Sequence, residues 1–249
     1  MKNNIWEGIY RSFKELPVLG DGFQSDQWII DSRRKMIDLL KEDKSSIFSL
    51  RNVEPFLPVV VALIDNGKKD IKILDFGGNL GITYSQLRSS AISRKIEYHI
   101  VENHRVCEEG KKLFSLDKSI QFHDSLPENL GYVDIVHIHS VLQYVQDWKS
   151  KIKQLMAYRP KYFLLVNLSA GNIPTYATVQ NYYDSKLPYW FLNINEVIDI
   201  FRAEGFELLF KSTYHATILG REQEIPQDNF PEEYRLGNAC NLLFRRKDD

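Results

Sequence analysis

The sequence predicts an α/β protein built on an open, doubly wound sheet. From about residue 70 onward, short β-branched runs alternate with amphipathic stretches, which is typical of repeated βαβ units and a mostly parallel sheet. The composition agrees with a folded core, since 43% of the residues are apolar and 26% are charged. A length of 249 residues suits one α/β domain with a small cap.

Five runs rich in β-branched and aromatic residues are the expected strands of this sheet. They cover residues 71–76, 95–102, 119–123, 133–139 and 162–168. Helical spacing fills the intervals between them, as in residues 81–87, in 107–114 and in the set Trp148, Ile152, Leu155 and Met156. Strands and helices in this order predict a doubly wound arrangement.

The pattern changes after the fifth strand. Residues 169–192 carry turn formers and six aromatic residues but no sustained period, so we expect a long ordered loop or lid there. Asn195 is the expected N-cap of a helix that ends at Gly205. Two further strands, 206–212 and 239–246, have no helix between them, which predicts an antiparallel last pair in a sheet of seven.

The N-terminal part differs from the alternating region. Residues 27–41 repeat apolar residues at helical spacing, and a second helix is expected over 53–66. We therefore expect an N-terminal helical cap over residues 1–50 and the main domain over 51–249.

Charge and cysteine content narrow the range of partners. The chain has 32 Lys and Arg against 33 Asp and Glu, which offers no positive field for a nucleic acid. Two cysteines are too few for a disulfide framework, so a reducing compartment is expected. The longest apolar run, residues 59–64, is far shorter than a membrane span, and the first residues lack an apolar signal core. We expect a cytoplasmic protein without membrane contact.

The most informative motif is ILDFGGNLGITY, residues 73–84, in which a strand runs through glycines into a helix. A ligand approaches a backbone closely only where no Cβ intervenes, and the first amides of a helix favour an anionic group. A nicotinamide dinucleotide fingerprint needs glycines at its first, third and sixth positions. Those positions hold Gly77, Asn79 and Ile82, which weakens that interpretation.

The spacing Asp75, Gly77 and Gly81 resembles the motif of class I S-adenosylmethionine-dependent methyltransferases, and the resemblance covers most of residues 70–246. It implies a Rossmann-like sheet with S-adenosyl-L-methionine as cofactor. The glycine loop would cradle the methionine part of the cofactor, and Asp75 would help to place its ammonium. The positions that the resemblance assigns to the cofactor are Asp75, Gly77, Gly78, Asn79, Gly81, Glu102 for the ribose, Asp124 with Ser125 for the adenine, and Ser140.

Residues 139–148 resemble the segment that lines the methyl-transfer site in this family. His139 is the candidate base, and Tyr144 is expected beside it. In an alternative interpretation, His137 and His139 are packed histidines with satisfied nitrogens. Metal is not required, because His139 and Ser140 stand where metal-dependent members keep carboxylates.

Residues 6–13, 22–28, 142–144 and 180–193 are similar to a smaller group of bacterial and archaeal methyltransferase-like proteins, whose members often accompany surface-polysaccharide genes. The resemblance implies that association and fixes no substrate. From the residues themselves, we expect a small polar acceptor such as a sugar or polysaccharide precursor. Aromatic residues of the 169–192 segment would form a wall over it, with Tyr183 touching the acceptor, or would merely pack the loop. A nicotinamide-dependent oxidoreductase and a catalytically silent cofactor-binding protein remain as alternatives.

Overall fold

The structure, a computed structural model, describes residues 4–41, 56–64, 70–89, 95–218 and 220–247. The chain forms two compact units. The first unit comprises Met1–Gly22, His139–Ala157 and Tyr162–Asp249, and the second comprises Phe23–Ile138 and Tyr158–Lys161. The expected boundary at residue 50 lies outside the described residues.

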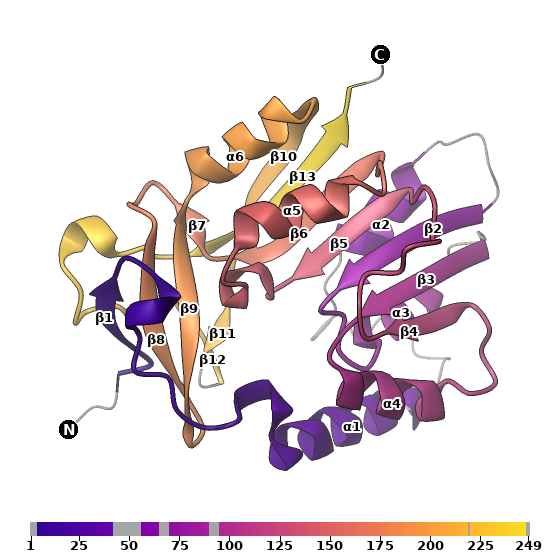
Figure 1. The fold of residues 1–249 in the computed structure, drawn as a ribbon, viewed down its shortest axis with the longest axis horizontal. Coiled ribbons are helices and arrows are strands. Elements are labelled where there is room, and N and C mark those ends of the chain that lie inside the picture. Colours follow the sequence, from indigo (N-terminus) through magenta and orange to yellow (C-terminus); the bar gives the residue numbers. More distant parts are fainter. Residues whose placement is uncertain (1–3, 42–55, 65–69, 90–94, 219, 248–249) are drawn as a thin grey trace. The chain divides into compact units, whose positions relative to one another are not determined.

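A seven-stranded sheet, in the order β10-β13-β6-β5-β2-β3-β4, confirms the predicted fold class (Figure 1). Its strands are β2 (Asp70–Phe76), β3 (Lys95–Val101), β4 (Ile120–His123), β5 (Ile135–His139), β6 (Tyr162–Leu168), β10 (Phe206–Tyr214) and β13 (Ala239–Arg246). Strand β13 runs antiparallel to both of its neighbours, β6 and β10. The last pair of strands is therefore antiparallel, as the missing helix between them predicts.

The second unit contains helices that lie before β2, between β2 and β3, and after β3 along the chain. They are α1 (Asp26–Lys41), α2 (Phe56–Leu63), α3 (Ile82–Ser89) and α4 (His104–Leu113). Met36 of α1 packs against Leu80 and Val106 in a buried cluster. Arg105 of α4 also binds Asp26 at the start of α1. Helix α1 is thus held against the region around the glycine loop by both apolar and ionic contacts.

Residues 169–192 are not a long loop, so that expectation was wrong. They form β7 (Ala170–Gly171), β8 (Tyr176–Tyr182) and most of β9 (Ser185–Asn193), where β8 and β9 pair as an antiparallel hairpin. The first four residues of β8 are all buried. A strand covered on both faces shows no alternation of polar and apolar residues, which explains why its period was not recognised.

The N-terminal segment is not wholly helical either. Strand β1 (Trp6–Tyr10) pairs antiparallel with β8 and completes a four-stranded sheet in the order β1-β8-β9-β7. Pairing with a strand about 170 residues further along the chain satisfies the backbone of this short segment, which a local pattern cannot reveal. The expected helices within 27–41 and 53–66 are present as α1 and α2.

The remaining elements lie mostly in the first unit. They are η1 (Phe13–Glu15), η2 (Gly22–Gln24), η4 (Leu142–Tyr144), α5 (Trp148–Met156), α6 (Ile194–Ala203), β11 (Thr217–Ile218), β12 (Arg221–Glu222) and η5 (Glu232–Tyr234). Asn193, and not Asn195, caps α6, because its side chain accepts a hydrogen bond from the Asn195 N–H. The helix ends before Gly205, whose φ of 80° suits glycine.

Candidate functional site

The glycine loop joins β2 to α3 and has the backbone shape that its sequence requires. Gly77 and Gly81 have φ values of 77° and 84°, in the left-handed region that favours glycine, and Asn79 has a φ of 50°. A Cβ at Gly78 would collide with the carboxylate of Asp75. Asn79 also accepts a hydrogen bond from the Leu80 N–H at 2.7 Å. The loop therefore needs small or Asx-type residues at these positions.

Asp75 is buried at the end of β2 and is hydrogen-bonded within the second unit. Its side chain is 1% exposed, with Tyr98 Oη donating to Oδ2 at 2.6 Å and His137 Nδ1 lying 2.9 Å from Oδ1. His137 is Asp75's partner in the β2–β5 register, so the sheet itself sets this contact. His137 is fully buried, and this contact accounts for its Nδ1. An ammonium group at Asp75 would have to share the carboxylate with these two side chains.

Glu102 follows β3, which pairs with β2, and Asp124 follows β4, which pairs with β3. Glu102 Oε2 accepts hydrogen bonds from the Asn103 main-chain N–H at 2.7 Å and from Asn103 Nδ2 at 3.1 Å. Burial, and to a smaller extent nearby Asp75, raises the pKa of Glu102. Asp124 and Ser125 are exposed, and Asp124 Oδ2 lies 3.3 Å from His104 Nδ1.

These residues meet at one edge of the sheet because their strands are parallel and in register. Val101 pairs with Phe76 of β2 and with His123 of β4, so the three chain segments leave their strands side by side. The structure thus brings Asp75, the glycine loop, Glu102 and Asp124 together within the second unit. Ligands of such sheets bind outside the carboxyl ends of the strands, at this kind of edge.

Ser140 and His139 belong to the first unit. Ser140 has a φ of 57°, which is uncommon for a residue other than glycine. Its Oγ accepts hydrogen bonds from Asn167 Nδ2 at 3.1 Å and Gln143 Nε2 at 3.2 Å. Asn167, at the end of β6, also has a positive φ, of 50°. The half-buried His139 ring lies edge-on to Tyr214, with 6.2 Å between ring centroids.

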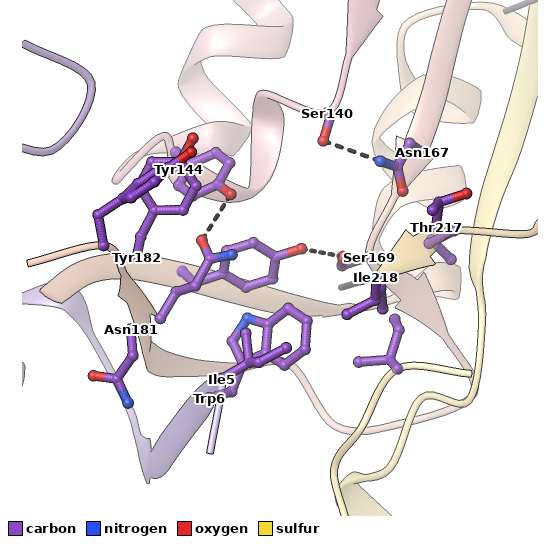
Figure 2. A pocket seen from close by; sticks show the side chains of 16 residues that line it. Ile5, Trp6, Ser140, Tyr144, Asn167, Ser169, Asn181, Tyr182, Thr217 and Ile218 are labelled. Atoms are coloured by element: carbon purple, nitrogen blue, oxygen red, sulfur yellow. Dashed lines mark hydrogen bonds between the residues drawn. The ribbon is translucent and has the colours of Figure 1, made fainter. Parts of the chain in front are cut away.

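A cavity of about 560 Å³ lies wholly within the first unit (Figure 2). Its size is within the range of small-molecule sites. Its walls come from β1, β8, β9, the segment after β5 and the β11 strand. The side chains that line it are Ile5, Trp6, Ser140, Tyr144, Asn167, Ser169, Gln180, Asn181, Tyr182, Tyr183, Tyr189, Ala216, Thr217, Ile218, Ile225 and Ala239.

The hydroxyl groups of Tyr144, Ser169 and Tyr189 are held by hydrogen bonds within this cavity. Tyr144 Oη donates to Gln180 Oε1 at 2.7 Å, and the Ser169 and Tyr189 hydroxyls lie 2.5 Å apart, as the dashed lines of Figure 2 show. Burial raises the pKa of Tyr144 well above its ordinary value and that of Tyr189 to about 12. Both phenols are therefore neutral near pH 7 and act as hydrogen-bonding groups.

The predicted acceptor-side residues have different surroundings. Tyr144 and Tyr183 line the cavity, whereas His139 is not among its lining residues. Tyr183 stands at the turn between β8 and β9, is 75% exposed and has a φ of 49°. Sequence reasoning did not identify Trp6, Asn167 and Gln180. The available signal was the alternation of Tyr176, Thr178 and Gln180, which places all three on one face of β8.

Comparisons with known proteins point to one fold. No protein-family model matches the chain, and no curated protein sequence matches it. Among solved structures, Burkholderia thailandensis 1,6-didemethyltoxoflavin-N1-methyltransferase, with 1,6-didemethyltoxoflavin and S-adenosylhomocysteine bound, has a TM-score of 0.54 at 10% identity; the match covers 96% of this chain and 100% of that one. The methyltransferase solved with the Haloferax volcanii Trm112 activator has a TM-score of 0.56 at 12% identity, over 90% and 96% of the two chains.

A third similar structure is an S-adenosylmethionine-dependent methyltransferase from Clostridium acetobutylicum, with a TM-score of 0.52 at 10% identity over 86% and 99% of the two chains. The chain has the class I methyltransferase fold. In this methyltransferase fold, the sheet edge formed by Asp75, Gly77–Gly81, Glu102 and Asp124 is where the sequence motif predicts the cofactor. At these low identities the structural similarity establishes the fold, and the role of each residue stays a prediction.

The described part of the chain gives two further results on metals and membranes. It contains no group of three or more His, Cys, Asp and Glu side chains placed to hold a metal ion. None of its helices combines the length and apolar character that a bilayer span requires.

Proposed function

We propose that the protein is an S-adenosylmethionine-dependent methyltransferase that acts on a small polar acceptor. The observation that carries this proposal is the sheet edge of the second unit, where a glycine loop with left-handed backbone angles and two strand-end carboxylates meet in the methyltransferase fold. A strand order with antiparallel β13 beyond β6 supports it further, because dinucleotide-binding sheets place a parallel sixth strand there.

The residues present fit the proposed cofactor in their chemistry. Amides of the Gly77–Gly81 loop and the first turn of α3 would hold its carboxylate, since helix N-termini favour anions. Glu102 would accept hydrogen bonds from the ribose hydroxyls, and Asp124 with Ser125 would face the adenine. Asp75 has its own partners, Tyr98 and His137, so its main role in this proposal is to hold the loop in shape.

When bound, the cofactor supplies an activated methyl group on a sulfonium. The chain mainly has to orient the acceptor and exclude water, because in-line positioning provides much of the acceleration of such a transfer. The first-unit cavity is our candidate acceptor site. Ser140, which follows β5 directly along the chain, lines this cavity together with Tyr144. Tyr144 and Tyr183 would bind the acceptor, and His139 is the candidate base.

The segments that form the cavity support this choice of acceptor class. Residues 6–13 and 180–193, which resemble the polysaccharide-associated group, provide Trp6, Gln180 and Tyr189 to its walls. Aromatic faces with amide and hydroxyl groups suit a sugar ring or another compact polar ring. We also propose a cytoplasmic location, because Cys107 and Cys240 are free thiols, as in a reducing compartment.

Calorimetry with S-adenosylmethionine, S-adenosylhomocysteine and NAD tests the cofactor first. We expect the two sulfur ligands to bind and NAD not to bind; the opposite result would establish an oxidoreductase. Release of S-adenosylhomocysteine is then measured with a panel of sugars and other small polar acceptors. Cofactor binding without turnover on any acceptor would favour the catalytically silent alternative.

A further inference from the structure

The cavity of the first unit carries no formal charge on any of its described lining residues. Its ionisable groups are phenols, and burial raises the pKa of both Tyr144 and Tyr189. A charged ligand would lose its hydration there without gaining an opposite charge, which is strongly unfavourable. The cavity therefore favours an uncharged molecule.

Among the lining residues, Trp6 has a buried side-chain N–H donor without an acceptor. Its side chain is 5% exposed and packs edge-on against Tyr189 and Phe191, with ring centroids 5.8 and 5.7 Å away. Its Nε1 is buried without a hydrogen-bond partner. Buried N–H donors are nearly always paired, because an unpaired one has lost its water and gained nothing. In Figure 2 the indole lies among the lining side chains.

Gln180, directly opposite Trp6 in the ladder, provides a second N–H donor through its side-chain amide. The two residues are register partners in the β1–β8 ladder, so their side chains project from the same face of the sheet as near neighbours. Tyr144 Oη donates to Gln180 Oε1, which fixes the amide with its Nε2 as the remaining donor end. Both N–H donors belong to residues that line the cavity.

We propose that Trp6 and Gln180 form a two-donor site for the carbonyl oxygen of an uncharged ring compound, of which an N-acylated amino sugar is the class that fits the proposed acceptor. A carbonyl oxygen has two lone pairs and can accept from two donors at once. The aromatic walls would cover the apolar faces of the ring. A ligand reaches Nε1 by displacing a lining side chain, since the nitrogen is sealed from solvent in the structure.

The inference rests on the proposed function for its choice of ligand, but binding is tested without any cofactor. Protein labelled with ¹⁵N is titrated with N-acetyl-D-glucosamine, and the indole N–H signals of the four tryptophans are followed by NMR. We expect the Trp6 signal to shift and the Trp190 signal to stay. D-Glucose, which lacks the acyl carbonyl, should bind more weakly, and D-glucuronate, which is charged, should not bind.

Matched variants isolate the donor. Trp6→Phe keeps an aromatic ring and removes Nε1, and ligand-detected NMR should show a loss of affinity of roughly tenfold for one hydrogen bond. Trp190→Phe is the control, because Trp190 Nε1 is likewise buried without a partner but Trp190 does not line the cavity. Gln180→Leu provides a second variant if Trp6→Phe fails to fold.

Three results would overturn the inference: a Trp6 signal that stays in place up to the solubility limit of N-acetyl-D-glucosamine, equal binding of glucuronate, or unchanged affinity in folded Trp6→Phe or Gln180→Leu. Failure of S-adenosylhomocysteine to bind in calorimetry would overturn the proposed function instead, and would leave the titration result intact.

Discussion

Replacing Glu102 by Gln tests the cofactor site most directly. Burial raises the pKa of this carboxyl, with nearby Asp75 adding to the effect, while hydrogen bonds from Asn103 and Asn79 oppose it. In the proposed complex, the ionised carboxylate accepts hydrogen bonds from the ribose hydroxyls. Glutamine keeps the shape and one carbonyl oxygen but removes the charge.

The expected loss follows from the value of hydrogen bonds to a charged group, about 1.5–3 kcal/mol. Since about 1.4 kcal/mol corresponds to tenfold, Glu102→Gln should bind S-adenosylhomocysteine roughly 10- to 150-fold more weakly near pH 8. The wild-type affinity should also fall as the pH is lowered through the raised pKa, because protonation removes the same charge. Calorimetry across a pH series measures both effects, and the variant should lose this pH dependence.

The stability of the ligand-free protein should change in the opposite direction. A carboxyl whose folded-state pKa is raised disfavours folding in its ionised form, so its unfavourable contribution is present above the folded pKa and disappears as the pH falls through it. Glu102→Gln should therefore raise the melting temperature near pH 8 while weakening the cofactor. Glu109→Gln, on α4, where Glu109 pairs with Arg33 and Lys112, is the control and should leave affinity unchanged. Native affinity in Glu102→Gln would refute the assignment of this residue to the ribose.

Other variants test neighbouring features. Gly77→Val forces a branched residue into a φ of 77°, so cofactor binding should be lost, and circular dichroism should show a retained fold; normal calorimetric affinity would contradict the loop assignment. Tyr98→Phe removes the hydroxyl that donates to Asp75 and should lower the free energy of unfolding by about 1.5–3 kcal/mol in urea titrations; no change would show that the bond contributes nothing. His139→Gln should reduce kcat about a hundredfold at unchanged cofactor affinity, and unaltered kcat would exclude a base role.

Much of the sheet could be predicted from the sequence because parallel strands and their helices leave local periodic patterns. The ends of β2, β3 and β4 were located closely enough to place Asp75, Glu102 and Asp124 at the carboxyl ends of these three strands. Their proximity then follows from the topology, since neighbouring parallel strands bring their carboxyl ends to the same edge of the sheet. Partners such as Tyr98 for Asp75 were not predictable, because they depend on the register of strands far apart in the chain.

The cavity could not be predicted for the same reason. Trp6 meets Gln180 through a pairing of β1 with β8, and in neither strand do buried and exposed residues alternate. Strand β8 is covered on both faces over its first half, which erases its period. Of the aromatic residues in 169–192, Tyr182, Tyr183 and Tyr189 line the cavity, whereas Tyr176 and Phe191 pack in a buried core cluster. This division depends on the β8–β9 hairpin and its pairing with β1.

Ser140 separates the cofactor and acceptor assignments in one pair of substitutions. It was expected to touch the cofactor, yet its side chain lines the first-unit cavity and its Oγ accepts from Asn167 and Gln143. A φ of 57° disfavours serine by about 1–2 kcal/mol, a strain that Ser140→Gly relieves and Ser140→Ala keeps.

Both variants lose the shared hydrogen-bond acceptor, so the free energy of unfolding of Ser140→Ala, measured in urea titrations, should be lower than that of Ser140→Gly by about 1–2 kcal/mol. If the hydroxyl serves the acceptor, both should raise the acceptor KM and leave the calorimetric affinity for S-adenosylhomocysteine unchanged. If the well-folded Ser140→Gly protein binds S-adenosylhomocysteine more weakly but keeps a normal acceptor KM, Ser140 would be assigned to the cofactor site. That outcome would mean that the cavity's polar end, where Asn167 also lies, belongs to the cofactor and not to the acceptor.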